Sequence, residues 1–89
     1  MTLVSQTIAE RAETHGVWYE QSTTAQAIKD IIRRSHNWDA LTCSQREALE
    51  MIAVKISRIL NGDPCHRDNW HDLAGYAALE EMEQGRWRS

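Results

Sequence analysis

The stretch that decides the fold runs from Arg46 to Leu79 and reads REALEMIAVKISRILNGDPCHRDNWHDLAGYAAL. At about 100° per residue, the apolar residues of its first half gather on a stripe about 120° wide. They are Leu49, Ile52, Ala53, Ile56, Ile59 and Leu60. The residues Met51, Val54, Lys55 and Arg58 lie off this stripe. The pattern predicts an amphipathic helix that packs one face on a core.

Two overlapping signals mark the start of this helix. Thr42 with Gln45 has the spacing of a capping box, and Ser44 with Glu47 repeats that spacing two residues later. In a capping box the hydroxyl accepts a hydrogen bond from a backbone amide that has no partner in the helix, and the Gln or Glu side chain returns one. The helix is therefore expected to begin at one of these two positions.

The end of this helix and the start of the next are marked by Asn61-Gly62 and Asp63-Pro64. Gly and Asn favour the backbone geometry that ends a helix, and proline excludes helical geometry from the residue before it. A further helix is expected from Arg67 or Asp68 to about Glu83. Its apolar face holds Trp70, Leu73, Ala74 and Ala77, and Gly75, Ala77 and Ala78 keep it slim.

The first part of the chain predicts another helix, from Met1 to Thr14. Apolar and small residues recur there with helical spacing, and Gly16 follows as a stop of the left-handed kind. The next segment, Val17–Tyr19, shows no helical period and is interpreted as an apolar connector between helices, with stacking on a ligand as the less favoured alternative.

A second capping-box spacing, Thr23 with Gln26, predicts that a helix begins there and continues to about Arg34. The polar segment Ser35–Leu41 that follows is interpreted as a loop. We expect the Trp38 indole within it to cover the bundle.

Together these signals predict one all-α domain over residues 1–89, a small bundle of about four helices. The tail Gly85–Ser89 is expected to fray. A chain of this size buries only about 60 to 65% of the surface that its unfolded form exposes, so its own core is thin. Because Met51 and Val54 also lie outside the apolar stripe, we expect a homo-oligomer, at least a dimer.

The composition excludes several classes of protein. Hydrophobic residues make up 42% and charged residues 26%, which is typical of a globular domain, and no apolar run approaches the length of a membrane span. The net charge of -3 argues against a dedicated duplex nucleic-acid binder, which needs a clustered cationic face. The absence of a signal peptide indicates an intracellular protein.

The two cysteines, Cys43 and Cys65, are interpreted as small apolar fillers in a reduced compartment, with a disulfide as the less favoured alternative. With His66 and His71 they lack the closely paired spacing of a zinc site. The remaining histidines, His15 and His36, are expected to be solvated at the ends of loops.

Carboxylates form one candidate site. Glu47 and Glu50 are three residues apart on the first helix of the deciding stretch, and Asp68 and Asp72 are four apart on the second. Pointing into one groove, these four groups would make a cage of oxygen ligands for Mg²⁺. The same spacing also occurs on solvated helix faces, and Asp68 alone also suits a helix cap.

Cationic residues form the other candidate site. Lys55 and Arg58 could donate to a phosphate while Tyr76 or a tryptophan stacks on a base. The competing interpretation is an ion pair between Asp72 and Lys55 or Arg58 that fixes the register of the two helices without any ligand. No Gly-rich phosphate loop is present to favour the first interpretation.

Several segments resemble a family of small helical proteins encoded by tailed phages and prophages and known as a domain of unknown function. The resemblance rests on Arg46–Ile52, on Lys55–Pro64 and on Asp68–Tyr76, with weaker similarity over Glu10–Gly16 and around Ile28–Lys29. It implies a phage origin and a helical fold over nearly the whole chain, and it implies no activity.

A more distant similarity is to the MazG-like all-α nucleotide pyrophosphohydrolases, which hold Mg²⁺ with Glu-x-x-Glu on one helix and Glu-x-x-Asp on the next. Glu47 and Glu50 match the first motif, whereas Asp68 and Asp72 depart from the second. The resemblance implies a Mg²⁺-dependent hydrolase, and the departure argues against it.

Three functions therefore compete. The favoured one is a phage accessory protein of the infected host's cytoplasm that binds a nucleotide-type ligand and sequesters a cyclic nucleotide immune signal. The alternatives are a MazG-like pyrophosphohydrolase and a protein-binding inhibitor or structural adaptor without a small ligand. The ligand-binding residues predicted for the favoured function are Lys55, Arg58, Trp70, Asp72 and Tyr76.

Overall fold

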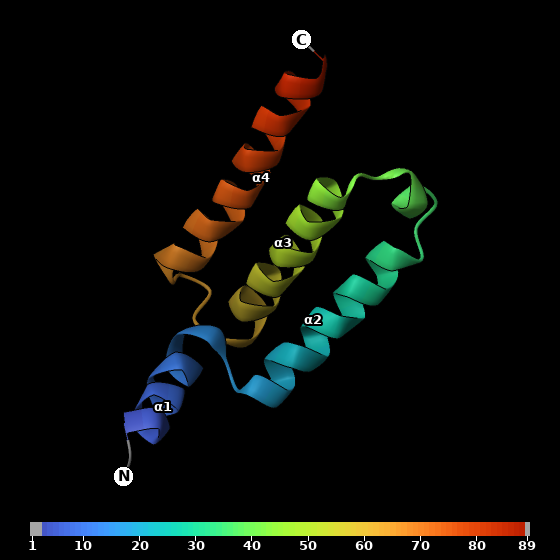
Figure 1. The fold of residues 1–89 in the computed structure, drawn as a ribbon. Helices are drawn as coiled ribbons and strands as arrows, with labels where there is room; N and C mark the ends of the chain where they lie inside the picture. Colours follow the sequence, from blue (N-terminus) through green and yellow to red (C-terminus); the bar gives the residue numbers. More distant parts are fainter. Residues whose placement is uncertain (1–2, 89) are drawn as a thin grey trace.

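The computed structural model describes residues 3–88, which form four α-helices and one short 3₁₀ helix, with no strand in that range (Figure 1). The elements are α1 (Leu3–His15), α2 (Trp18–Arg33), η1 (Trp38–Ala40), α3 (Cys43–Asn61) and α4 (Arg67–Arg88). The all-α prediction with four helices is confirmed. No helix in the described part of the chain is long and apolar enough to span a membrane.

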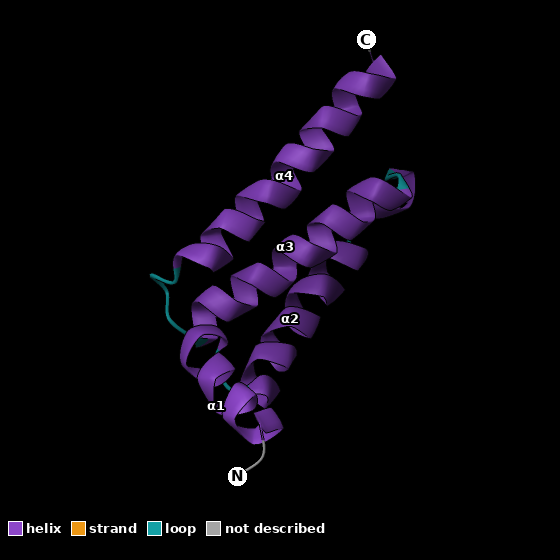
Figure 2. Cartoon of the chain, turned by 60° about the vertical axis from the view of Figure 1, so that its left-hand side comes forward, coloured by secondary structure: helices purple, strands orange, loops and turns teal. Residues whose placement is uncertain are grey.

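Helix α3 is the centre of the arrangement. It packs against α2 on one side and α4 on the other, both running antiparallel to it, and α1 lies across its C-terminal end (Figures 1 and 2). Helices α2 and α4 make at most marginal contact with each other. The three long helices therefore form an open layer rather than a closed bundle, and the molecule measures 52 × 25 × 23 Å.

The interior of this layer contains little apolar volume. Across residues 4–86, whose side chains the structure describes, the buried apolar side chains are Ala25 and Ala53 alone. The apolar stripe predicted for α3 is only partly covered, since Leu49 is 38% and Leu60 is 66% exposed. The expectation of a thin core holds, and the stripe keeps a large part of its surface in solvent.

The start of α3 follows the first of the two predicted capping boxes. The Gln45 backbone amide donates to Thr42 Oγ1 at 3.1 Å, and the Thr42 amide donates to Gln45 Oε1 at 2.9 Å. Ser44 instead donates its hydroxyl to a carboxylate oxygen of Glu80 on α4. The predicted end of the helix at Asn61 is also confirmed.

Helix α2 begins five residues earlier than predicted. It starts at Trp18, so the expected connector over Val17–Tyr19 is wrong, as is the capping box at Thr23. The Thr23 hydroxyl donates to the Tyr19 carbonyl at 2.7 Å, which is the bond that a threonine inside a helix makes to the preceding turn. The true N-cap, Val17, offers no side-chain hydrogen bond, which explains why the sequence carries no signal for it.

The remaining boundaries differ in detail. Helix α1 ends at His15, and the predicted positions 1 and 2 lie outside the described residues. Helix α4 starts at Arg67 as predicted but continues to Arg88, so the tail over Gly85–Ser89 is helical in its described part. Its amides and carbonyls continue the ladder of the preceding turns, because no glycine or proline geometry interrupts it.

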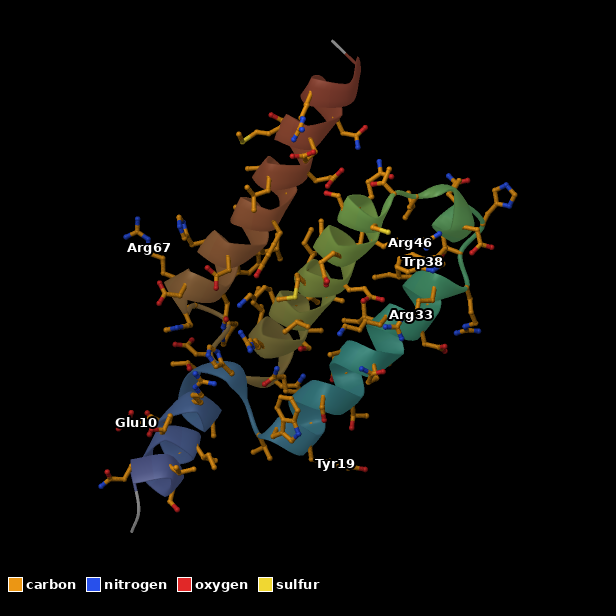
Figure 3. The ribbon with its side chains drawn as sticks, viewed as in Figure 1. Glu10, Tyr19, Arg33, Trp38, Arg46 and Arg67 are labelled. Carbon is orange, nitrogen blue, oxygen red and sulfur yellow. The ribbon has the colours of Figure 1, made fainter. Side chains whose placement is uncertain are left out.

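The segment before α3 contains the 3₁₀ helix η1 and is held by one arginine. Arg46 donates from Nε to the Trp38 carbonyl and from a terminal nitrogen to the Asp39 carbonyl, both at 3.1 Å. Its guanidinium also lies 5.3 Å from the centroid of the half-buried Trp38 ring (Figure 3). This arginine anchors the turn between α2 and α3.

Candidate functional site

The C-terminal ends of α1 and α3 meet at two glycines. Gly16 has φ +87°, the left-handed geometry predicted for it, and a Cβ there would lie 2.4 Å from the Asn61 carbonyl oxygen. A Cβ on Gly62 would lie 2.3 Å from the Thr14 carbonyl oxygen. The two backbones are therefore in direct contact, at a separation that only glycine permits.

Buried polar side chains hold this glycine joint together. Asn69 of α4 is 1% exposed and donates to the Thr14 carbonyl at 3.3 Å. Asn61 donates to Thr24 Oγ1 of α2 at 3.0 Å and to the Ser57 carbonyl at 2.8 Å. These hydrogen bonds join α4 to α1 and α3 to α2, and the backbone contact at the two glycines joins α1 to the end of α3. The joint therefore fixes where α1 sits.

A cavity of about 510 Å³, here called the basic pocket, lies beside this joint. Helices α1, α2 and α3 all contribute to its wall, which is mostly apolar but carries two guanidinium groups, an imidazole and an indole. The lining residues are Ile8, Arg11, Ala12, His15, Gly16, Val17, Trp18, Gln21 and Arg58.

The electrostatics of the basic pocket favour an anion. Arg58 Nε and His15 Nδ1 are both buried and have no hydrogen-bond partner in the part of the chain that the structure describes. Burial lowers the pKa of His15 below its usual value, and the positive charges of Arg58, His66, Lys55 and Arg11 lower it further. None of the lining residues is acidic, so this cluster of cations faces no carboxylate in the pocket wall. A ligand bearing phosphate would supply the missing negative charge and hydrogen-bond acceptors.

Of the predicted ligand-binding residues, Arg58 lines the basic pocket, whereas Lys55 and Asp72 pair with each other. Lys55 Nζ lies 3.0 Å from Asp72 Oδ2, and the lysine side chain is only 8% exposed. The hydrogen bond from Lys55 lowers the pKa of Asp72, and the charge of the ammonium adds to the effect. The pair links α3 to α4 in the way that the ligand-free interpretation describes.

The two aromatic residues predicted for the site lie elsewhere on α4. The Trp70 indole is 52% exposed and donates to the Pro64 carbonyl at 2.7 Å, which fastens the α3–α4 loop to the start of α4. Tyr76 is half-buried further along the helix. Neither residue belongs to the wall of the basic pocket.

The carboxylates predicted to hold Mg²⁺ point in different directions. Glu50 Oε1 lies 2.7 Å from Arg33 Nε of α2, and Glu47 is exposed. Asp68, in the first turn of α4, has its Oδ2 3.9 Å from Nε2 of His66, which lies just before that helix. Within residues 3–88, no group of three or more His, Cys, Asp or Glu side chains is placed to hold a metal ion. The geometry does not gather these four carboxylates into one cage.

The cysteines and histidines also differ from expectation. Cys43 and Cys65 are free thiols on exposed positions, so they are not apolar fillers of the core. His36 is exposed as predicted, but His15 is half-buried in the last turn of α1, with its ring 5.9 Å from that of His66. The interpretation of His15 as a solvated loop residue is wrong because α1 folds back onto α3.

Comparison with known protein families gives a match over residues 1–83 to DUF6378, a domain of unknown function. The chain belongs to this family. No curated protein and no solved structure matches it. The family resemblance noted from the sequence is therefore confirmed at the level of an uncharacterised domain family.

The residues that sequence reasoning missed are those that α1 and the start of α2 bring to Arg58. They are Arg11, His15 and Gln21, together with Trp18, for which stacking on a ligand is only the less favoured interpretation of the sequence. One signal could have pointed to them: Arg11 and His15 are four residues apart, on one helix face, directly before a left-handed glycine that turns the chain back. The sequence alone does not show which helix this face meets.

Proposed function

We propose that this protein binds a phosphate-bearing, nucleotide-type ligand in the basic pocket. The observation that carries the proposal is Arg58, which lines the cavity together with Arg11 and His15 and whose buried Nε has no hydrogen-bond partner among the described residues. A buried polar group without a partner is costly, so such a group in a cavity favours a ligand that completes its hydrogen bonds.

The shape and chemistry of the pocket suit a nucleotide. Its volume of about 510 Å³ falls in the range typical of small-molecule sites. Guanidinium groups form bidentate hydrogen bonds with phosphate oxygens, so the proposal assigns the phosphates to Arg11 and Arg58. The Trp18 indole and the apolar side chains of the wall would take the base, since an aromatic ring stacks on any base.

The proposed role is sequestration rather than turnover. The pocket wall carries no carboxylate to hold a metal ion, so the arrangement favours binding without chemistry. A small protein of a phage, acting in the cytoplasm of the infected host, could in this way withdraw a cyclic nucleotide that serves as an immune signal. The phage origin rests on the sequence resemblance and is part of the proposal.

Calorimetric titration tests the binding. Cyclic dinucleotides, cyclic trinucleotides and ADP-ribose should be titrated into the wild-type protein, into Arg58→Gln and into Arg67→Gln. Arg67 is an exposed arginine at the start of α4, outside the pocket, and serves as the matched control (Figure 3). Loss of a charged hydrogen-bonding group predicts at least roughly tenfold weaker binding for Arg58→Gln alone.

Two results would contradict this proposal. The first is the absence of heat with every compound, and the second is equal loss of affinity in both variants. A separate incubation with nucleoside triphosphates and Mg²⁺ should leave the substrates intact. Release of pyrophosphate would argue for the hydrolase instead of sequestration.

A protein-binding inhibitor or structural adaptor remains a second candidate, and one observation favours it. Large apolar side chains on α1 and the start of α2 are exposed: Val4 at 68%, Trp18 at 72% and Tyr19 at 76%. Exposed large apolar side chains are what a protein-binding surface would use if they are contiguous. Under this candidate Tyr19→Ser should abolish capture of a specific host protein while the nucleotide titration stays silent in the wild type.

A further inference from the structure

One face of the α2–α3–α4 layer is apolar and uncovered. Its central ridge is formed by α3 residues at helical spacing, with Leu49 and Leu60 at its two ends and Ile52 and Ile56 between them. Leu49 and Leu60 are eleven residues apart, which brings them to within about 20° of each other around the helix. This apolar ridge is the outward half of the stripe that the sequence predicts as core.

Two shallow grooves flank the Leu49 end of the apolar ridge. The groove between α2 and α3 has a volume of about 270 Å³ and includes Ile32, Trp38 and Leu49 in its wall. The groove between α3 and α4 has a volume of about 290 Å³ and includes Leu49, Ile52 and Ala77. Leu49 lines both grooves, as does Leu41 before α3, so Leu49 lies at the crest of the ridge where the two grooves adjoin. A ridge between two grooves is the surface into which helices of a second layer interlock.

This face lies opposite the basic pocket. Arg58 follows Leu49 by nine residues, which places it about 180° around α3 from the crest of the ridge. Covering the apolar face would therefore leave the mouth of the basic pocket accessible. The apolar face and the basic pocket therefore lie on different sides of the molecule.

The exposed area of the chain is larger than that of a compact protein of its mass. A folded monomer of 10.3 kDa is expected to expose about 5,400 Å², whereas this chain exposes 6692 Å². The excess, about 1,300 Å², exceeds the roughly 800 Å² that each partner contributes to a standard protein interface. The chain thus carries enough additional surface for one stable interface.

We propose that a second copy of this chain docks on the apolar face, packing two α2–α3–α4 layers against each other. The walls of the two grooves contain a single charged residue, Glu80, whose carboxylate already accepts hydrogen bonds from Ser44 and Gln84. Groups near a twofold axis lie close to their own copies, so grooves nearly free of charge suit a symmetric pair. A strongly charged partner would find no complementary groups there.

The experiment measures the mass in solution by light scattering for the wild type, Leu60→Glu and Leu79→Glu. Leu60 and Leu79 are similarly exposed, at 66% and 60%. Leu79 lies about 200° around α4 from Ala77, on the side away from the groove, and is the matched control. The wild type and Leu79→Glu should have at least twice the mass of one chain, and Leu60→Glu should be monomeric with an unchanged helical circular dichroism spectrum.

Since Leu60 is largely exposed in the single chain, a charge there should be tolerated by the fold itself. If Leu60→Glu loses its helical spectrum, Leu49→Gln provides the second variant, with the same expected dissociation. A monomeric wild type would overturn the proposal. So would an assembled protein that keeps its mass in both the Leu60 and Leu49 variants, or one that dissociates with Leu79→Glu.

Discussion

The glycine joint and the apolar face of the layer differ in which side chains are buried. At the joint, Gly16 and Gly62 bring backbones into contact, and the buried side chains are polar, with Asn69 at 1% exposure. On the apolar face, leucines of the same helix α3 remain in solvent, with Leu60 at 66%. At these two places polar side chains are buried and large apolar side chains are exposed, the reverse of the usual preference.

This difference indicates which contacts determine the structure of the single chain. Hydrogen bonds and close backbone approach are directional, so the joint fixes the position of α1 and with it the basic pocket. Apolar burial is not directional and scales with area. Under the proposed docking of a second copy, apolar burial is completed at an interface, which supplies area that a chain of 89 residues lacks.

The largest effect is expected at the joint from Gly62→Ala. Its Cβ would lie 2.3 Å from a backbone oxygen of Thr14, so the two helix ends must separate. We expect a loss of roughly 2 to 4 kcal/mol in the free energy of unfolding, measured by urea denaturation.

The matched control for this substitution is Gly75→Ala, also a glycine but with no heavy atom within 4 Å of the added Cβ. It lies inside α4, where alanine favours the helix by about 0.5 to 1 kcal/mol. If both variants had the same free energy of unfolding, the close approach of the backbones at the joint would not contribute to stability.

A smaller loss is expected from Asn69→Ala. The substitution removes the buried donor to the Thr14 carbonyl and leaves a small void. We predict about 1 to 3 kcal/mol less stability by urea denaturation. Gln26→Ala, at an exposed position of α2, should change stability by less than about 0.5 kcal/mol. Equal values for the two would mean that the polar interior is dispensable.

Removing either partner of the ion pair between α3 and α4 should lower the stability of the fold, but by different amounts. Asp72→Asn leaves the buried Lys55 ammonium without its carboxylate, whereas Lys55→Met removes the charge and keeps the apolar stem. We therefore expect a lower Tm for Asp72→Asn than for Lys55→Met. The order reverses only if the lysine finds another partner or reaches solvent.

Acid should weaken the fold in two steps of small size. The pKa of His15 is lowered in the folded chain, so its contribution to stability is present above pH 6.5 and is lost as pH falls below that value. The pKa of Asp72 is also lowered, so its contribution is present above pH 3.8 and is lost as pH falls through the folded value. Unfolding at a series of pH values should show the first step disappear in His15→Gln. Persistence of that step would assign it to another group.

Local signals made much of the fold predictable from the sequence. The capping box at Thr42, the stop at Gly16 and the break at Asn61-Gly62 act through neighbouring residues, and each lies where the structure has a helix end. The Lys55–Asp72 pair was one of two alternatives for those charges. Helix α2 was placed too late because its N-cap, Val17, makes no side-chain bond that a pattern could reveal.

The candidate site was less predictable, because it depends on tertiary placement. Arg58 was chosen from its position off the apolar stripe, and it does line the basic pocket. Its partners Arg11, His15 and Trp18 reach it only because the glycine joint folds α1 back, a contact between residues more than forty positions apart. The exposure of Leu49 and Leu60 likewise follows from α2 and α4 lying on either side of α3 without closing over it.

Native mass spectrometry of the purified protein tests the account most directly, since one spectrum reports both the number of chains and any retained ligand. For the wild type we predict assemblies of at least two 10.3 kDa chains that carry the additional mass of a phosphate-bearing compound. Arg58→Gln should keep the same number of chains and lose only the additional mass. A bare single chain in the wild type, still without added mass after incubation with cyclic nucleotides, would contradict both the interface and the pocket.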